Sequence, residues 1–500
     1  MTGFLTASSY LLFLYYTATN VAYLLLLVVS IRATIVHQRR LSVLRLHGLR
    51  TSALAPPISI LVPARNEERG IVESVRSLLA LDYSEIEVIV VNDGSTDGTL
   101  EALRQHFGLV RTNILHVSEI PTAPVRGIFM STADRRLIVI DKESCGRKAD
   151  ALNAGLNAAS SPFICAVDAD AVLESDALLR VMAPALADPT RVIASGGIVR
   201  VVNGSTIDHG RVRRVRLPRT LVETLQVIEY LRAFLVGRQG WAGLNLLVII
   251  SGAFGVFRRD ICREIGGYRT GAIGEDMDLV VRLHRHARER GDAYRITFVP
   301  DPVCWTEVPS TYRSLARQRA RWQNGLADVL WRNRDMLGNR RYGAIGLLAL
   351  PYQWVFEFFA PVVEVFGWTS MIAAATVGAL SPSFFVKFLL FGYLFGTLIS
   401  IGSVVIEEMS YHRYNDPRDL VRLLGACFLE HFPYRQLNSL WRLRGMWEFL
   451  TGRNAWRMIN RVGLGGTPST HSTAAAPTPA APPPSPWPSW SADSRHRPPV

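Results

Sequence analysis

The sequence predicts an α/β domain placed between membrane-spanning helices. Residues 10–31 are almost free of charge and long enough to cross a bilayer, and a second apolar block covers residues 343–408. Between these blocks, short apolar runs alternate with polar turns and with segments of helical periodicity. Repetition of strand, turn and helix is typical of a parallel sheet that binds ligands at its strand ends.

Composition and charge favour a membrane protein over a nucleic-acid binder. The chain has 500 residues, of which 49% are hydrophobic, and a formal net charge of +13. Its arginines are spread over the flanks of apolar segments and over helices, so we expect them to face membrane lipids and phosphates, and we expect no nucleic-acid partner. The five cysteines form no C-x-x-C pair, which predicts free thiols in a reducing compartment.

Five parts are expected along the chain. They are an N-terminal transmembrane anchor (1–33), a basic juxtamembrane linker (34–55), the α/β domain (56–335), transmembrane and interfacial helices (336–462) and a disordered Pro/Ala/Ser-rich tail (463–500). No small-residue cleavage site precedes the basic cluster, so we expect an anchor that is not removed. The positive-inside rule then places the α/β domain in the cytoplasm, as part of a multi-pass protein of the cell inner (plasma) membrane.

Apolar runs that end in polar turns predict the strands of the α/β domain. We expect strands at residues 58–62, 86–91, 137–140, 163–167, 192–202 and 249–257. We expect helices at 71–79, after 97, after 148, at 221–236, after 274 and around 317–322, and a basic turn at 211–216. The sequence has no G-x-x-x-x-G-K-[ST] and no G-x-G-x-x-G, which argues against Walker-type and dinucleotide-type phosphate binding.

The second apolar block predicts at least two membrane crossings. Residues 343–380 exceed one span and contain Pro351 and Pro361, which indicates a re-entrant or interfacial piece joined to a span. Residues 384–406 form a clearer span, and residues 420–441 are moderately apolar and suit the membrane interface.

Carboxylates stand at the ends of predicted strands. Asp168 and Asp170 follow the central strand, and Asp93 follows an earlier one. Hard oxygen ligands at a strand end suit Mg²⁺ or Mn²⁺, and such a cation suits a diphosphate. A single D-x-D triplet is a weak signal, because a chain of this length contains about one by chance. Asp276 and Asp278 form another such triplet.

An ordered set of motifs gives these carboxylates more weight. The set contains Asp93, a turn with Lys148, Asp168-Ala-Asp170, Glu275-Asp276 and Gln318-Arg-Ala-Arg-Trp322. In this order and between apolar segments, it resembles the processive family 2 glycosyltransferases, which include cellulose, chitin, hyaluronan and poly-N-acetylglucosamine synthases. The runs at 146–155 and 251–255 are similar to those of bacterial poly-N-acetylglucosamine synthases. The resemblance covers about residues 56–460.

The resemblance implies a Rossmann-like GT-A domain that uses a UDP-sugar and Mg²⁺ or Mn²⁺ and inverts the anomeric carbon. The catalytic residues would be Asp276, as general base, and Glu275. The donor would be bound by Ala64, Glu67, Asp93, Lys148 and Asp168, and the metal by Asp170 and Asp168. The diphosphate and acceptor would be contacted by Gln318, Arg321, Trp322, Ser251 and Gly252. Arg147 is a departure, because many relatives carry glycine there.

Each of these residues also has a structural interpretation. Asp168 and Asp170 could simply solvate a strand end, and Asp276 could stabilise a helix N-terminus. Trp322 could pack at the membrane boundary, which tryptophans favour. The chemistry of sugar transfer nevertheless requires these residue types, because a carboxylate must take the acceptor proton and cations must stabilise the leaving diphosphate.

From the resemblance we expect a membrane-embedded enzyme that extends a β-linked polysaccharide from a UDP-sugar, with UDP-N-acetylglucosamine as the favoured donor. The alternative is a single-addition transferase acting on a lipid acceptor, such as a diacylglycerol or a polyprenyl phosphate. A non-catalytic export or scaffold subunit is less favoured, because the motif set is complete. A small accessory membrane subunit is a further expected partner.

Overall fold

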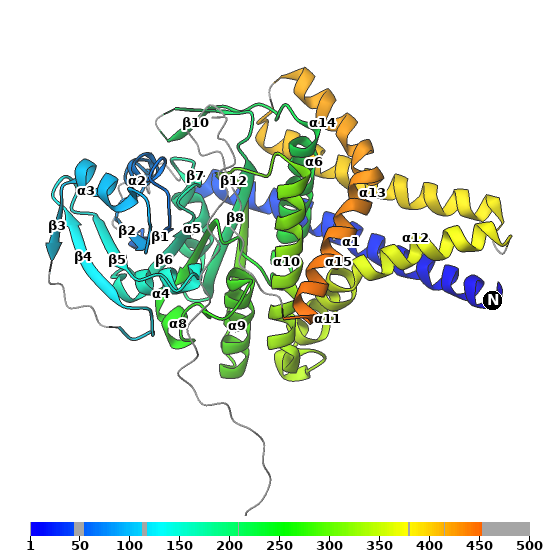
Figure 1. Ribbon diagram of the computed structural model, residues 1–500, viewed down its shortest axis with the longest axis horizontal. Coiled ribbons are helices and arrows are strands. Elements are labelled where there is room, and N and C mark those ends of the chain that lie inside the picture. The colour runs from blue at the N-terminus through cyan, green and yellow to red at the C-terminus, as the bar shows by residue number, and fades with distance from the viewer. Residues whose placement is uncertain are drawn as a thin grey trace, which may run out of the picture. The chain divides into compact units, whose positions relative to one another are not determined.

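The computed structural model of the chain describes residues 2–44, 55–112, 118–208, 210–378, 381–414 and 416–452. The expected disordered tail at 463–500 and residues 45–54 of the expected basic linker lie outside the described residues, and residues 34–44 of that linker continue the first helix. The sheet and the helices at both ends of the described chain belong to one compact unit, Met1–Gly465 (Figure 1). All five cysteines are free thiols, as the sequence predicts.

A mixed sheet of ten strands forms the centre of the α/β part, in the order β3-β4-β5-β2-β1-β6-β11-β8-β12-β7. Its strands are β1 (Ile58–Ala64), β2 (Ile86–Asp93), β3 (Leu109–Thr112), β4 (Val125–Ser131), β5 (Leu137–Lys142), β6 (Phe163–Val167), β7 (Val172–Leu173), β8 (Val192–Val201), β11 (Phe254–Arg258) and β12 (Arg295–Thr306). All five residues of β6 are buried, which explains why its sequence is continuously apolar.

The sheet is mixed: its parallel pairs are β5-β2-β1-β6 in the middle and β8-β12 near one end, and β3 and β4 at the other end pair antiparallel. Strands β5, β2, β1 and β6 run parallel, as predicted, but β11 is antiparallel to both β6 and β8. The strand predicted at 249–257 is partly wrong, since β11 begins only at Phe254; the preceding backbone bonds to side chains instead of a neighbouring strand. The basic turn predicted at 211–216 is an antiparallel hairpin of β9 (Thr206–Asp208) and β10 (Arg211–Arg214).

Helices cover the sheet and form the membrane part. The helices of the α/β part are α2 (Ile71–Leu79), α3 (Thr99–Phe107), α4 (Lys148–Ala158), α5 (Ala177–Ala187), α6 (Leu221–Leu231), η2 (Arg232–Arg238), α7 (Gln239–Gly243), α8 (Arg259–Glu264), α9 (Glu275–Arg290) and α10 (Tyr312–Arg332). The short elements η3 (Arg334–Met336) and η4 (Arg340–Tyr342) follow α10. The helix predicted at 221–236 is α6 continued by the π-helical η2.

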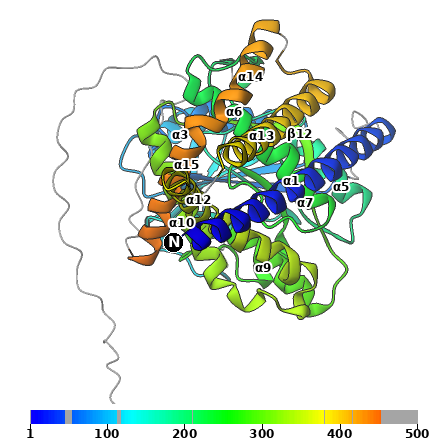
Figure 2. The ribbon, with the colours of Figure 1, turned by 90° about the vertical axis from the view of Figure 1, so that its right-hand side faces the viewer.

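The membrane part contains two helices that are long and apolar enough to cross a bilayer, and a bent helix pair that would make a third crossing. Its elements are α1 (Thr2–Leu44), η5 (Ile345–Ala349), α11 (Leu350–Tyr352), η6 (Gln353–Phe358), α12 (Ala360–Thr376), α13 (Pro382–Tyr411), α14 (Pro417–Leu429), η7 (Glu430–Tyr434) and α15 (Arg435–Leu450). The pair Ile345–Phe358 and Ala360–Thr376 bends by 44° beside Pro361, where the sequence predicts an interruption. Helices α1, α12 and α13 lie side by side (Figure 2).

Two ion pairs join membrane helices to the sheet. His37, near the end of α1, pairs with Asp301 in β12. Arg200 in β8 pairs with Glu407 in α13, and both side chains are almost completely buried. A buried charge is stable only while its partner is present, so these contacts tie the helices to the sheet specifically.

Helix α10 lies between the α/β part and α15, and glycines allow close approach on both sides. A Cβ on Gly445 of α15 would overlap the carbonyl oxygen of Ala320. On the other side, a Cβ on Gly274 would lie 3.4 Å from the carbonyl oxygen of Gly325. The first contact sets the distance between α10 and α15, and the second places α10 against the start of α9.

We expect Gly445→Ala to destabilise the protein, because the added methyl group has no space between α15 and α10. The expected loss is about 1–3 kcal/mol, typical of overpacking. Gly425→Ala in α14 is the matched control, since its Cβ meets no atom within 4 Å. Removing a helical glycine there should stabilise by about 0.5–1 kcal/mol. Thermal unfolding of the full chain in nanodiscs measures the stability of both variants. The same change in Tm for Gly445→Ala and Gly425→Ala would contradict the close packing of α15 on α10.

Candidate active site

The predicted site residues converge at one edge of the sheet. Asp93 ends β2, and Asp168 follows β6. Lys148 is the first residue of α4, and Glu275 and Asp276 open α9. Because β2 and β6 both pair parallel with β1, their carboxyl ends lie on the same edge.

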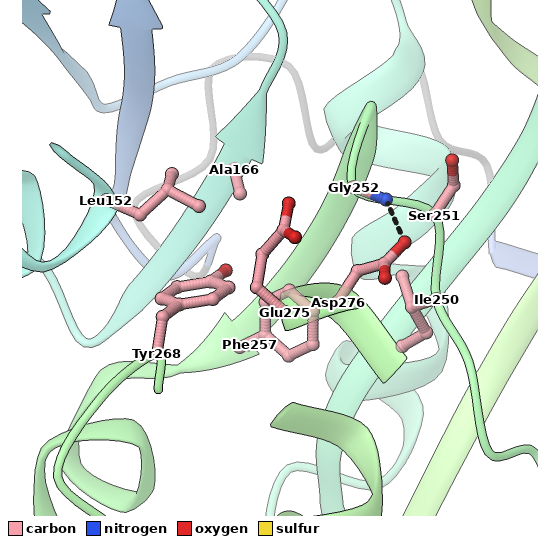
Figure 3. Close-up of a pocket in the computed structure, with 9 residues that line it drawn as sticks. All are labelled: Leu152, Ala166, Ile250, Ser251, Gly252, Phe257, Tyr268, Glu275 and Asp276. Carbon is pink, nitrogen blue, oxygen red and sulfur yellow. Dashed lines mark hydrogen bonds between the residues drawn. The ribbon is translucent and has the colours of Figure 1, made fainter. Parts of the chain in front are cut away.

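The backbone of Gly252 connects these residues. Its N–H donates to Asp276 Oδ2 at 3.0 Å, and its carbonyl oxygen accepts from Lys148 Nζ at 2.8 Å (Figure 3). Lys148 also forms an ion pair with Asp168. A Cβ on Gly252 would lie 3.3 Å from Lys148 Nζ and 3.5 Å from Asp276 Oδ2, so a side chain here would press on the Lys148 ammonium. These bonds explain why residues 249–253 leave the sheet.

Burial and nearby charges act on Glu275 and Lys148, and hydrogen bonds orient Asp276. Burial raises the pKa of Glu275 to about 7, helped by the adjacent Asp276 and opposed by Lys148. Burial lowers the pKa of Lys148, but Asp168 and Glu275 outweigh this and leave the pKa raised, so Lys148 stays charged. Asp276 is oriented by the Gly252 N–H and by the Met277 N–H, which donates to Oδ1 at 2.8 Å. Each of its oxygens keeps a lone pair for a proton.

The second D-x-D triplet has divided roles. Asp276 faces the pocket, whereas Asp278 is completely buried between two arginines. Arg282 Nε donates to Asp278 Oδ2 at 2.7 Å, and Arg269 Nη1 donates to Oδ1 at 3.1 Å. Asp278 therefore holds the fold together beneath the site.

Asp93, which the sequence predicts to contact the donor, is also buried and held on both oxygens. Lys142 Nζ donates to Oδ1 at 3.1 Å, and Ser144 Oγ donates to Oδ2 at 3.0 Å. Lys142 is fully buried and pairs with Asp150 as well. The orientation of Asp93 is thus fixed before any ligand arrives.

The neighbouring strand end carries the two other predicted donor residues. Ala64 is the buried last residue of β1. Glu67 lies in the following loop, where its N–H donates to Thr99 Oγ1 at 2.9 Å. The N–H of Asn66 donates to Ser95 Oγ at 3.0 Å, so this loop and the loop after β2 support each other.

The predicted motif at 318–322 lies in the first half of α10. Gln318 is buried, whereas Trp322 is 44% exposed with the Arg319 guanidinium 4.3 Å above its ring. The Gly325–Gly274 contact brings the helix to the site one turn later. Among the described residues, Gln318, Arg321 and Trp322 make no hydrogen bond or ion pair to Asp276, Lys148 or Asp168. The structure therefore brings Asp276, Lys148 and Asp168 together. The motif at 318–322 lies near these residues but is not bonded to them.

A small pocket marks the centre of the site. Its lining residues are Leu152, Ala166, Ile250, Ser251, Gly252, Phe257, Tyr268, Glu275 and Asp276 (Figure 3). Its volume of about 10 Å³ is room for roughly one water. Ser251 and Gly252, both predicted from sequence, are among the lining residues.

Two cations near the site were missed in the sequence. Lys142 orients Asp93, and its signal was a lysine directly after an apolar strand ending in Asp141. Arg238 is half-buried, with its guanidinium 3.9 Å above the Phe234 ring. Burial lowers the pKa of Arg238 to about 10, opposed by the negative charge of Asp276. Its signal was an arginine at the end of the apolar run at residues 233–237.

The carboxylates Asp168 and Asp170 suit a divalent cation that is also bound by a diphosphate. No group of three His, Cys, Asp or Glu side chains in the described part of the chain could hold a metal alone. A cation on a diphosphate takes most of its ligands from phosphate and water, so one or two carboxylates suffice. Asp168 and Asp170 offer hard oxygens, and the ammonium of Lys148 already places a positive charge against Asp168.

Comparison with known families agrees with this geometry. Residues 59–266 match the family described as "Glycosyl transferase family 2", and residues 163–399 match "Glycosyl transferase family group 2". The chain belongs to glycosyltransferase family 2. The matched ranges of this glycosyltransferase include β1 through β12 and the start of the membrane part, and so contain every residue of the site described above.

Similar proteins are known among polysaccharide synthases. The poly-beta-1,6-N-acetyl-D-glucosamine synthases of Staphylococcus epidermidis and Staphylococcus aureus (strain COL) are 27% and 28% identical to this glycosyltransferase over 278 residues. The match covers 55% of this chain and 56% of each relative, so the chain spans about half the length of these curated relatives.

A solved structure has the same fold. The mannosyltransferase PcManGT from Pyrobaculum calidifontis, in complex with GDP-Man and Mn²⁺, aligns with a TM-score of 0.50 at 20% identity. The alignment covers 86% of this glycosyltransferase and all of that chain. At this identity the comparison supports the GT-A fold, with apolar helices on both sides of it.

We expect the raised pKa of Glu275 to make stability depend on pH. The folded protein holds this proton more tightly than the unfolded chain, so ionising Glu275 costs stability as the pH rises from about 4.5 to about 7. Glu275→Gln removes this cost. The variant should be more stable than wild type by about 1–3 kcal/mol at pH 8, with the difference vanishing towards pH 4.5.

Thermal unfolding at pH 5 and pH 8 measures this effect. Glu101→Gln, on the exposed surface of α3, is the matched control and should change Tm little at either pH. A Tm difference between Glu275→Gln and wild type that is the same at both pH values would contradict the raised pKa.

Proposed function

We propose that this glycosyltransferase extends a β-linked polysaccharide from a UDP-sugar, with UDP-N-acetylglucosamine as the donor. The observation that carries the proposal is the position of Gly252, whose backbone carbonyl holds a cation, Lys148, and whose N–H holds a carboxylate, Asp276. The similarity to poly-N-acetylglucosamine synthases supports the choice of donor and polymer.

In the proposed reaction, the acceptor hydroxyl attacks the anomeric carbon of the donor sugar from the side opposite the diphosphate. The new carbon–oxygen bond forms while the bond to the phosphate oxygen breaks, and the electron pair leaves with UDP. Asp276 takes the hydroxyl proton as general base. Attack from the opposite side inverts the anomeric centre, which yields a β-linkage from an α-linked donor.

The remaining residues would position the donor. Lys148 would face the diphosphate, where its charge favours the transition state as negative charge builds on the leaving group. Asp93, with Ala64 and Glu67 beside it, would contact the uracil and ribose. A divalent cation at Asp168 and Asp170 would neutralise diphosphate charge when bound. The motif from Gln318 to Trp322 would close over the diphosphate and place the acceptor.

The membrane helices suit a polymerase of the plasma membrane. The α/β part would lie in the cytoplasm, where nucleotide sugars are made, as the basic residues after the first span indicate. Contact of α10 with both α9 and α15 would place the growing chain between the site and the membrane helices.

We expect inverted membrane vesicles with the wild-type protein to convert radiolabelled UDP-N-acetylglucosamine into high-mass, alkali-stable product. Asp276→Asn removes the proposed base and should lower the rate about 10²–10⁴-fold. Asp292→Asn, at an exposed position after α9, is the matched control and should retain activity. The assay uses a panel of UDP-sugars and sizes the product.

Two results would contradict the proposal. A small product extractable into organic solvent would indicate a lipid acceptor in place of a polymer. No transfer and no UDP release with any UDP-sugar would exclude a UDP-sugar donor.

We expect transfer to stop when EDTA removes divalent cations and to resume on adding Mn²⁺ or Mg²⁺. Asp170→Asn should raise the cation concentration needed for half-maximal rate by at least about 10-fold, because removing a ligand weakens metal binding. Full activity in EDTA would show that the carboxylates serve another purpose. The Asp292→Asn protein again provides the control.

A further inference from the structure

The hydroxyl of Tyr268 is a buried polar group at the pocket. Tyr268 is only 3% exposed, and its Oη has no hydrogen-bond partner among the residues that the structure describes. Buried hydroxyls in folded proteins are nearly always paired, because an unpaired one loses its hydration without replacement. An unpaired hydroxyl that borders a binding pocket therefore points to a ligand.

The backbone of Tyr268 is held on both sides. The Asn153 side chain accepts from the Tyr268 N–H at 2.7 Å and donates to its carbonyl at 2.8 Å. Arg282 donates to the carbonyls of Ile265 and Gly267 in the preceding turn, at 2.9 Å and 2.5 Å. Gly267 has φ of +69°, and a Cβ there would lie 2.5 Å from Asn153 Oδ1. The turn is thus built to keep the ring in one place.

The surroundings of the hydroxyl describe the ligand group. Figure 3 shows the Tyr268 hydroxyl and the Glu275 carboxylate on the same side of the pocket, with Leu152 and Ala166 above them. The pocket has room for about one water, which is also the size of one hydroxyl group. A hydroxyl can accept from a tyrosine and donate to a carboxylate at once. The apolar part of the lining around this group comes from Leu152, Ala166, Ile250 and Phe257.

We propose that Tyr268 and Glu275 together bind one hydroxyl group of a sugar substrate, and that Tyr268 is a specificity-determining residue for it. Tyr268 donates to the oxygen of this hydroxyl, which in turn donates to Glu275. The inference rests on the proposed sugar transfer. The hydroxyl belongs either to the donor sugar or to the terminal sugar of the acceptor, and the experiment distinguishes these two sources.

The first test compares stability and activity of Tyr268→Phe. Loss of an unpaired buried hydroxyl should leave Tm unchanged or raise it, whereas loss of a substrate hydrogen bond should lower kcat/KM about 3- to 10-fold. Tyr83→Phe is the matched control, because the Tyr83 hydroxyl donates to the Pro56 carbonyl at 2.7 Å, before β2 and at the sheet edge opposite the site. That variant should lower Tm and leave kcat/KM unchanged.

A double-variant cycle tests whether Tyr268 and Glu275 share one ligand group. If they do, the loss of kcat/KM in the Tyr268→Phe/Glu275→Gln protein should be smaller than the product of the two single losses. Independent roles would give the full product, which would overturn the shared hydroxyl.

The source of the hydroxyl follows from two donor assays. Hydrolysis of UDP-N-acetylglucosamine without added acceptor should slow in Tyr268→Phe if the donor carries the hydroxyl, and should be unchanged if the acceptor does. Among donor analogues lacking one hydroxyl, at position 3, 4 or 6, wild type and variant should become equal on the analogue that lacks the bound group.

The outcomes separate this inference from the proposed function. Wild-type transfer together with unchanged kcat/KM in a folded Tyr268→Phe protein would overturn the inference and leave the proposed function intact. Absence of transfer by the wild type from any UDP-sugar would overturn both.

Discussion

A single residue, Gly252, connects the two opposite charges of the site through its backbone N–H and carbonyl. Its N–H orients the Asp276 carboxylate, and its carbonyl holds the Lys148 ammonium, which lies against Asp168. One chain segment therefore fixes the distance between the first turns of α4 and α9. The chain makes these contacts outside the sheet and returns to it as β11, which pairs antiparallel with β6. One short segment therefore links the geometry of the site to the strand order of the sheet.

Much of the fold could be predicted from the sequence because burial and polar turns leave local signals. The run Phe163–Val167 is apolar on both faces of the sheet, so its ends coincide with β6. Asp93 and Asp168 follow such runs, and parallel strands bring such ends together. The bend beside Pro361 was also local, since proline cannot supply the helical N–H.

Other features depend on contacts between distant segments and left little local signal. The direction of β11 is set by neighbours that are 60 to 90 residues away in sequence. Tyr268 looks like an ordinary core aromatic until Asn153 and Arg282 are seen to hold its turn. Trp322 belongs to a specific motif, yet the motif does not specify how the side chain is oriented. The residue is 44% exposed, with the Arg319 guanidinium over its ring.

The ion pairs between membrane helices and sheet have a consequence for anyone who wishes to study the catalytic half alone. Cutting the chain after the α/β part would remove Glu407 and leave Arg200 charged and unpaired in an interior that water does not reach. An uncompensated buried charge typically costs about 3–5 kcal/mol, which is a large share of the stability of a folded domain. A truncated fragment would be a poor surrogate for the intact enzyme, and the bilayer should be regarded as part of its folding environment.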